Sequence, residues 1–181
     1  VVLKLGSVLF VHGGVSPQVA RTGFTVDQLN AAMQDYWNDG SAHPPSPGLD
    51  AVLGHAGVTQ YRGWFRALDD RYPKASDDEV GEALGHFGAS MAVVGHTIVP
   101  GVERMRDGRV YAVDVNSNES ATEVLVFEDG VPRVVDIGVA RKLVDGQPAF
   151  REFSLLDSDH RRLLFGMVRD LRRLSALPHP Y

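Results

Sequence analysis

Two short apolar runs, each ending in a histidine beside glycine, place the strongest constraint on how this chain can fold. Leu9 to Val11 leads into His12-Gly13-Gly14, and Met91 to Val94 leads into Gly95-His96-Thr97. Short apolar runs bounded by glycine are typical of buried strands, and open α/β sheets carry their chemistry where strands end. A lone histidine in such a place is more often structural. Two that meet at one sheet edge predict a site for Zn, Mn or Fe, which imidazole binds well.

A third motif, Tyr61-Arg62-Gly63-Trp64, lies between the two histidine runs. The guanidinium of arginine is a planar fork of donors that matches the oxygens of a phosphate. The following glycine lets the backbone approach closely. An ordinary surface arginine is the alternative, and the two histidine motifs favour the phosphate-binding interpretation.

In this order, LFVHGGVSP, YRGW and VVGHT resemble the later motifs of the calcineurin-like metallophosphoesterases, particularly bacterial members of the phosphoprotein phosphatase branch. The resemblance covers roughly residues 1 to 128. It implies an α/β (α+β) fold, part of a four-layer αββα sandwich with two mixed sheets flanked by helices. It also implies that His12 and His96 bind the second of two divalent ions (Mn, Fe or Zn), and that Arg62 binds the substrate phosphate during catalysis. Asp114 is a candidate acceptor for the second ring nitrogen of a metal-bound histidine.

The earlier motifs of that family, GDxHG, GDxxDRG and GNHE, do not occur in the chain, and no initiator methionine precedes Val1. We therefore interpret residues 1 to 181 as the C-terminal portion of a single metallophosphoesterase domain, with the N-terminal half as its missing partner. Two histidines leave the ligand set incomplete, since catalytic metal sites use three or more protein ligands. The 181 residues alone are expected to be inactive.

The composition constrains the function less than the motifs do. The formal net charge of -5 does not favour nucleic-acid binding, and no apolar run reaches the length of a membrane span. The absence of cysteine excludes disulfides and thiolate metal ligands, and is compatible with either redox compartment. The localisation stays open, with the cytoplasm slightly favoured.

Local patterns predict the elements around the motifs. Val1 to Leu5 and Val8 to Val11 form a hairpin pattern, and Thr25 with Gln28 forms a capping box before a helix. That helix carries an apolar stripe of Leu29, Met33 and Trp37, while the Pro- and Ser-rich residues from Ser41 to Gly57 are interpreted as a long loop. Further predictions are a helix starting at Asp77, hairpins around Asp107-Gly108 and Asp129-Gly130, and a terminal helix over residues 157 to 174.

We consider three hypotheses for the function. The first is a metal-dependent phosphoesterase that hydrolyses phosphate monoesters, on phosphorylated proteins or small phosphoesters, with a hydroxide activated by two metals and no phosphoenzyme. The second, within the same superfamily, is hydrolysis of dinucleoside polyphosphates. The third is a non-catalytic binding or structural half.

Overall fold

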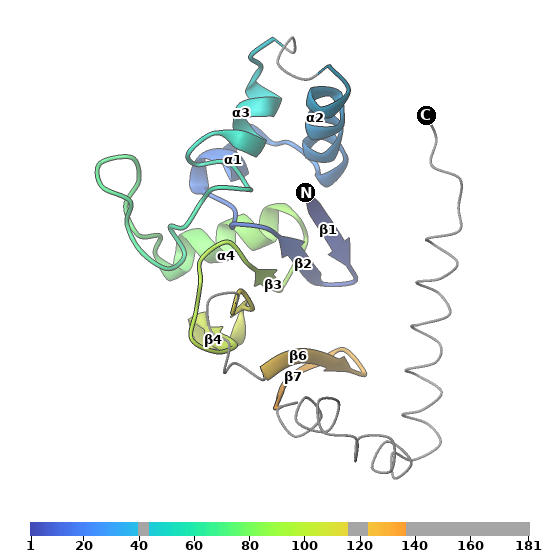
Figure 1. The fold of residues 1–181 in the computed structure, drawn as a ribbon, viewed down its shortest axis with the longest axis vertical. Helices are drawn as coiled ribbons and strands as arrows, with labels where there is room; N and C mark the ends of the chain where they lie inside the picture. The colour runs from blue at the N-terminus through green and yellow to red at the C-terminus, as the bar shows by residue number, and fades with distance from the viewer. Residues whose placement is uncertain (40–43, 116–122, 137–181) are drawn as a thin grey trace, which may run out of the picture. The chain divides into compact units, whose positions relative to one another are not determined.

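The computed structural model describes residues 1–39, 44–115 and 123–136 (Figure 1). Residues Val1–Val135 form one compact unit. The predicted terminal helix over 157 to 174 lies outside the described residues. Within the described ranges, no helix is long and apolar enough to cross a membrane. In chain order the elements are β1 (Val2–Leu5), β2 (Val8–Val11), α1 (Pro17–Thr22), α2 (Val26–Asp39), α3 (Pro47–Leu53), α4 (Asp77–His86), β3 (Met91–Val94), β4 (Glu103–Met105), the 3-10 turn η2 (Arg106–Gly108), β5 (Val110–Ala112), β6 (Glu123–Glu128) and β7 (Val131–Asp136).

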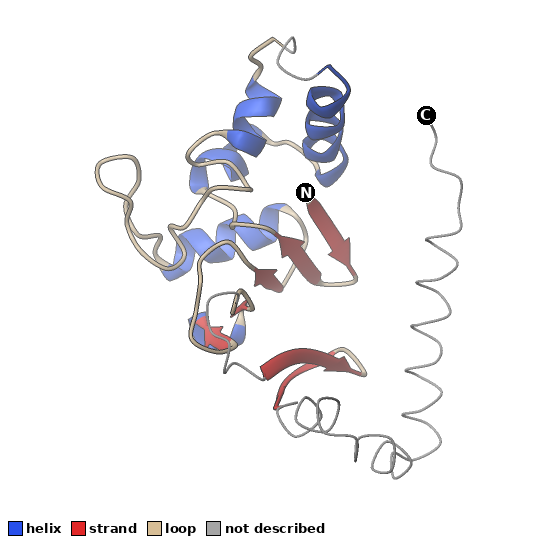
Figure 2. Ribbon diagram, viewed as in Figure 1, coloured by secondary structure: helices blue, strands red, loops and turns tan. Residues whose placement is uncertain are grey.

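A five-stranded mixed sheet, in the order β1-β2-β3-β5-β4, organises the fold (Figure 2). Its three central strands, β2, β3 and β5, run parallel, and β1 and β4 are antiparallel edges. The described residues also include a two-stranded sheet, β6-β7. The α+β class predicted from the sequence is confirmed, as are the hairpins at β1-β2 and β4-β5, and β6 pairs with β7 on either side of Asp129-Gly130, where the third was predicted.

One face of the sheet lies in the core. The strand positions that face it are at most 5% exposed, and they join one cluster with the apolar side of α4: Leu9, Val11, Ala92, Val94, Val110, Ala112, Val80, Ala83 and Leu84. Helix α1 packs on α4, and α2 packs on α3 and β1. Alternation along the strands produces this burial, because every second side chain points to the helices.

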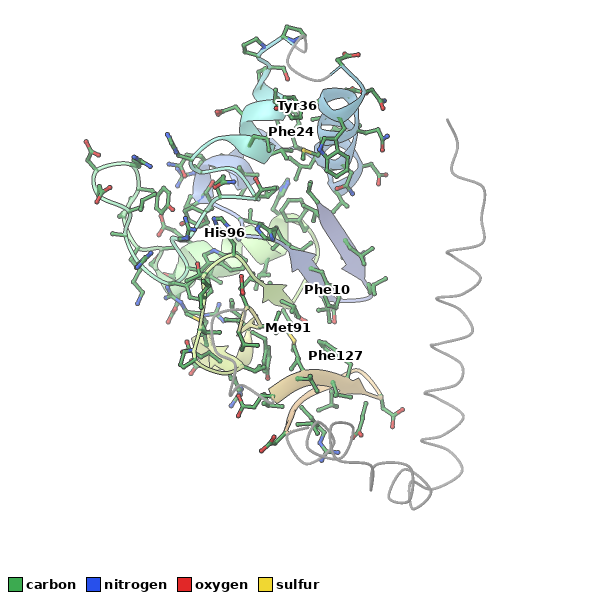
Figure 3. The ribbon with its side chains drawn as sticks, viewed as in Figure 1. Phe10, Phe24, Tyr36, Met91, His96 and Phe127 are labelled. Carbon is green, nitrogen blue, oxygen red and sulfur yellow. The ribbon has the colours of Figure 1, made fainter. Side chains whose placement is uncertain are left out.

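The opposite face is apolar and partly bare. Leu3 and Leu5 are 52% and 57% exposed, and their strand partners on this face include Phe10. The Phe10 ring meets that of Phe127 from β6 edge-on, with ring centroids 6.1 Å apart (Figure 3). A cavity of about 360 Å³ opens on this face and reaches the strand end at His12.

Two sequence predictions were wrong in part. The stretch from Ser41 to Gly57 contains helix α3, because Ser46 caps it through a bond from the Leu49 amide and Pro47 takes its first turn, where proline is tolerated. Trp37 is 68% exposed and does not belong to the core stripe of α2. At 100° per residue it lies about 80° around the helix from the buried Leu29.

The predicted helix starts are confirmed. The Gln28 amide donates to the Thr25 hydroxyl at 3.2 Å, and the Thr25 amide donates to the Gln28 side chain at 2.9 Å. Helix α4 begins at Asp77 behind a second capping box, formed by Ser76 and Glu79. Both helices therefore satisfy amides that would otherwise lack partners in their first turns.

Candidate functional site

The register of the parallel strands brings the two histidine motifs to one edge of the sheet. Val11 on β2 pairs with Val94 on β3, so both strands end at the same level. The Gly95 amide then donates to the His12 carbonyl at 2.9 Å, which extends the ladder past the last strand residues. His12 and His96 therefore leave the sheet side by side, as the sequence predicted.

The two imidazoles converge. His12 Nε2 lies 3.1 Å from His96 Nδ1, and the rings are tilted by 54°. His96 (labelled in Figure 3) has φ +59, a left-handed backbone conformation that non-glycine residues seldom adopt. Such outliers cluster at functional sites, because the surrounding structure must hold them in place.

The pair has the spacing of two ligands on one ion. Two imidazole nitrogens bound to a common metal lie roughly 2.8 to 3.4 Å apart, given bonds of about 2.0 to 2.1 Å and angles of about 90 to 110°. A hydrogen bond between the two rings would give the same distance. Within residues 1–39, 44–115 and 123–136, no group of three or more His, Cys, Asp or Glu side chains could hold a metal ion. The pair could therefore supply two ligands to a metal ion, and the described residues supply no third from these side-chain types.

The surroundings of His96 favour its neutral form. Burial lowers the pKa of His96 below its ordinary value of 6.5, and the charges of Arg62 and His12 lower it further, while Asp114 opposes them. The neutral imidazole is the form that binds a metal. His96 Nε2 is buried and has no hydrogen-bond partner among the described residues, so Asp114 does not accept from it, and a role of Asp114 toward His12 stays a prediction.

Arg62 lies in residues 61–75, here called the arginine segment, near its tightly packed N-terminal end. Tyr61 and Trp64 are each 1% exposed, while Arg62 between them is half-buried. The Arg62 amide donates to the Tyr72 hydroxyl at 3.0 Å, and burial raises the pKa of the Tyr61 phenol. A side chain at Gly63 would collide with the Tyr61 ring, so glycine is needed there for a reason other than the close backbone approach expected from the sequence.

Gly13 joins the arginine segment to the histidines. Its amide donates to the Val58 carbonyl at 2.8 Å, and a Cβ atom at Gly13 would lie 2.9 Å from the Tyr61 carbonyl oxygen. Real Cβ atoms essentially never approach backbone so closely. The HGG motif therefore leaves room for the backbone that leads into Arg62.

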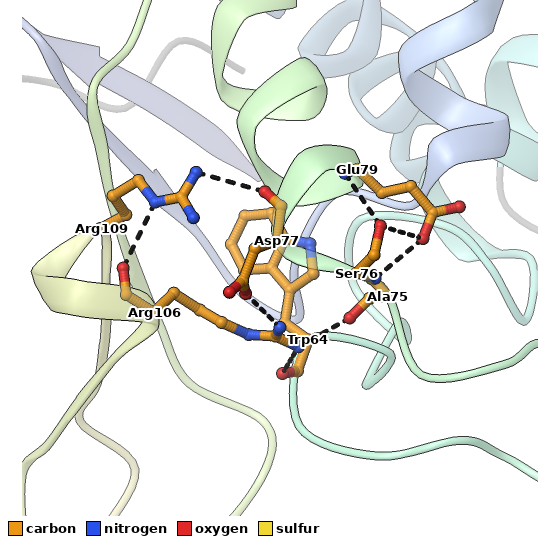
Figure 4. Close-up of polar contacts among 7 residues, drawn as sticks. All are labelled: Trp64, Ala75, Ser76, Asp77, Glu79, Arg106 and Arg109. Carbon is orange, nitrogen blue, oxygen red and sulfur yellow. Dashed lines mark hydrogen bonds and ion pairs between the residues drawn. The ribbon is translucent and has the colours of Figure 1, made fainter.

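Sequence reasoning missed Arg106. Its guanidinium donates to the Trp64 and Ala75 carbonyls, both at 2.8 Å, and pairs with Asp77 at 2.5 Å (Figure 4). That bond holds the pKa of the Asp77 carboxyl below its ordinary value. Arg106 adjoins the predicted Asp107-Gly108 turn, and nothing in the local pattern marks its side chain as buried.

Solved structures with a similar fold are phosphatases. A cold-active protein tyrosine phosphatase aligns with 76% of this chain at 26% identity and a TM-score of 0.58, with 39% of its own length covered. The protein-tyrosine phosphatase of a psychrophilic Shewanella species aligns at 27% identity with the same TM-score, over 76% of this chain and 40% of its own. The chain thus spans about two fifths of their length. No family model and no curated protein matches it, so the calcineurin-like resemblance in particular gains no support from those comparisons.

Proposed function

We propose that the chain supplies part of the active site of a phosphoester hydrolase. In this proposal His12 and His96 bind a divalent metal, and Arg62 binds the phosphoryl oxygens of the substrate. The observation that carries it is the 3.1 Å approach of His12 Nε2 to His96 Nδ1, with Arg62 near enough to lower the pKa of His96. The similar phosphatase structures, at 26% and 27% identity, support the reaction class.

The proposed substrate is a phosphorylated protein. Both similar enzymes are described as protein tyrosine phosphatases, which favours a phosphoprotein over a dinucleoside polyphosphate. Because the 181 residues contain no cysteine, they contribute no thiolate nucleophile for a phosphocysteine route. This composition favours direct attack by water or hydroxide on phosphorus.

The chain's own residues have distinct tasks in this scheme. The Arg62 fork orients the phosphoryl group through paired donors and offsets the charge that develops on its oxygens. His12 and His96, as neutral imidazoles, would hold the metal, one of the Mn, Fe or Zn ions of a two-metal centre. When bound, such ions polarise the phosphoryl oxygens and activate a water molecule.

The remaining ligands are proposed to come from an upstream half of the same domain. The bare apolar face beside His12, with Leu3 and Leu5 more than half exposed, is the surface such a half would cover. The similar enzymes are about two and a half times as long as the part that aligns, by the 39% and 40% coverage of their chains. A non-catalytic binding role is the outcome if no upstream half completes the site.

The test compares the 181-residue chain with the same chain co-expressed with its upstream coding region. Each is assayed for hydrolysis of p-nitrophenyl phosphate, a phosphotyrosine peptide and a dinucleoside polyphosphate in the presence of Mn²⁺. We expect no turnover by the chain alone, and metal-dependent turnover of the first two substrates by the complemented protein. Robust turnover by the chain alone would contradict the proposed division of ligands. Hydrolysis of the dinucleoside polyphosphate alone would replace the proposed substrate class.

A further inference from the structure

We infer that Arg106 is a positioning residue that fixes the backbone of the arginine segment, so that Arg62 stays near His96. This inference rests on the proposed role of Arg62. The guanidinium of Arg106 bonds to the carbonyls of Trp64 and Ala75 and to Asp77 at the start of α4 (Figure 4).

Arg106 bonds on both sides of residues 65–74 of the arginine segment, here called the excursion. The carbonyls of Trp64 and Ala75 flank these residues, and both accept from Nη2 of Arg106 at 2.8 Å. Nη1 pairs with Asp77 in the first turn of α4, and the Arg106 side chain is only 13% exposed. Most of the residues between the two carbonyls are exposed, while Phe65, Leu68 and Tyr72 pack on the core.

The restraint passes from Ala75 to Arg62 through the backbone. The Ala75 carbonyl accepts from Arg106, and the Ala75 amide donates to the Gly63 carbonyl at 2.8 Å. Gly63 follows Arg62 directly. Losing the Arg106 bond to Ala75 should therefore loosen the backbone on the C-terminal side of Arg62, while the Arg62 amide keeps its bond to the Tyr72 hydroxyl.

The turn that presents Arg106 contains two non-glycine residues with positive φ. Arg106 and Asp107 have φ +52 and +56, consecutive left-handed conformations at non-glycine residues. Arg109 supports the turn, because its amide and its Nε both donate to the Arg106 carbonyl, at 3.1 and 3.3 Å. Positive φ at Asp107 and Gly108 is what an Asp-Gly hairpin turn requires, so of the two non-glycine residues only Arg106 is left-handed outside that pair.

Lysine cannot replace Arg106 in this arrangement. Two carbonyls and a carboxylate are reached by donors on one rigid planar fork, whereas an ammonium is a compact point charge on a flexible stem. Arg106→Lys keeps the charge near Asp77 and is expected to keep the fold while loosening the segment. Arg104→Ala is the matched control, because Arg104 lies on the same hairpin and is exposed, and among the described residues its side chain donates only to the Asp107 carbonyl, at 3.3 Å.

Limited trypsinolysis of the full chain tests whether Arg106 restrains the arginine segment. The exposed trypsin sites between Trp64 and Ala75 are Arg66, Arg71 and Lys74. Arg106→Ala and Arg106→Lys should speed cleavage there, with Arg104→Ala cutting like wild type and thermal melts confirming that each variant is folded. Cleavage of a folded Arg106→Lys at the wild-type rate overturns the inference.

A double-mutant cycle in the complemented protein tests the link to Arg62. Arg106→Lys should lower kcat for p-nitrophenyl phosphate by roughly 10- to 100-fold, the scale of a small misplacement of a catalytic group. In an Arg62→Ala background the same change should have no further effect. An additional loss in that background overturns a role through Arg62. Wild-type turnover by Arg62→Ala itself contradicts the proposed function, while the cleavage assay still reports on the hold of Arg106.

Discussion

The histidine pair and the arginine segment reach the same place by different means. His12 and His96 follow paired parallel strands, so the main-chain register alone delivers them to one edge. Arg62 lies on a long connection whose shape depends on side chains far along the chain, with Arg106 bonded to a carbonyl 42 residues earlier. Positions set by sheet register tolerate much surface variation. Positions set by side-chain contacts can be loosened by one remote substitution.

The largest effect should come from the arginine itself. In the complemented protein, Arg62→Ala is expected to lower turnover of p-nitrophenyl phosphate by roughly 10²-fold or more, the scale for losing one donor that stabilises transition-state charge. Arg62→Lys should recover only part of this, because the planar fork is lost. Steady-state kinetics with matched metal loading measure both. Near-normal turnover by Arg62→Ala would reject the phosphate-binding role.

Gly13, which lies between the histidine pair and the arginine segment, should be the next most sensitive position to substitution. Gly13→Ala would push a methyl group against the Tyr61 backbone and is expected to lower the free energy of unfolding by about 1 to 3 kcal/mol, as overpacking does. Gly85→Ala is the matched control, since a Cβ there meets nothing within 4 Å on the exposed side of α4. It should raise stability by about 0.5 to 1 kcal/mol. Urea unfolding separates the two, and equal effects would show that Gly13 has no special contact.

A pH effect should follow from the environment of His96. Because the folded pKa of His96 lies below its ordinary value of 6.5, the unfolded chain binds a proton there first as the pH falls. The free energy of unfolding should therefore decrease below about pH 6.5, and this loss should level off once the folded imidazole protonates. His96→Asn, which suits the left-handed backbone, should flatten the profile in that window.

Arg62→Gln sharpens this test. Removing its positive charge should raise the pKa of His96 toward the ordinary value and reduce the pH dependence, since Arg62 is one of the charges that lower it. Chemical unfolding from pH 5 to 8 measures each profile. An unchanged slope in both variants would place the titrating group elsewhere.

The smallest effect is expected at Trp37. Because its side chain is 68% exposed, Trp37→Gln should change the free energy of unfolding by no more than about 0.5 kcal/mol. Leu29→Ala, at the buried position of the same helix, should cost about 2 to 5 kcal/mol. A large loss for Trp37→Gln would mean that this side chain is covered in solution.

The sequence correctly predicted features that depend on a few neighbouring residues. The hairpin before His12, the capping box at Thr25 and the strands ending in glycine and histidine each depend on a few neighbouring residues, and all three are present. Helix α3 also had its signals in Ser46 and Pro47, and the proline-rich composition around them concealed it.

Other features depend on partners distant in the sequence. The exposure of Trp37 depends on what α2 packs against, and the burial of Arg106 depends on carbonyls at Trp64 and Ala75. No periodicity or motif in the neighbourhood of either residue specifies such contacts. The metal and phosphate roles of the candidate site came from motif resemblance, and the structure adds the proximity of His12 and His96.

Titration of Mn²⁺ into chain labelled with ¹⁵N-histidine tests the central claim most directly. Paramagnetic broadening reports proximity to the ion even when binding is weak, as two protein ligands imply. We expect the imidazole signals of His12 and His96 to broaden together at the lowest Mn²⁺ concentrations, and His96→Asn to abolish the effect on His12. Broadening of His12 that survives His96→Asn, or that appears no earlier than at the exposed His55, would contradict a shared metal site.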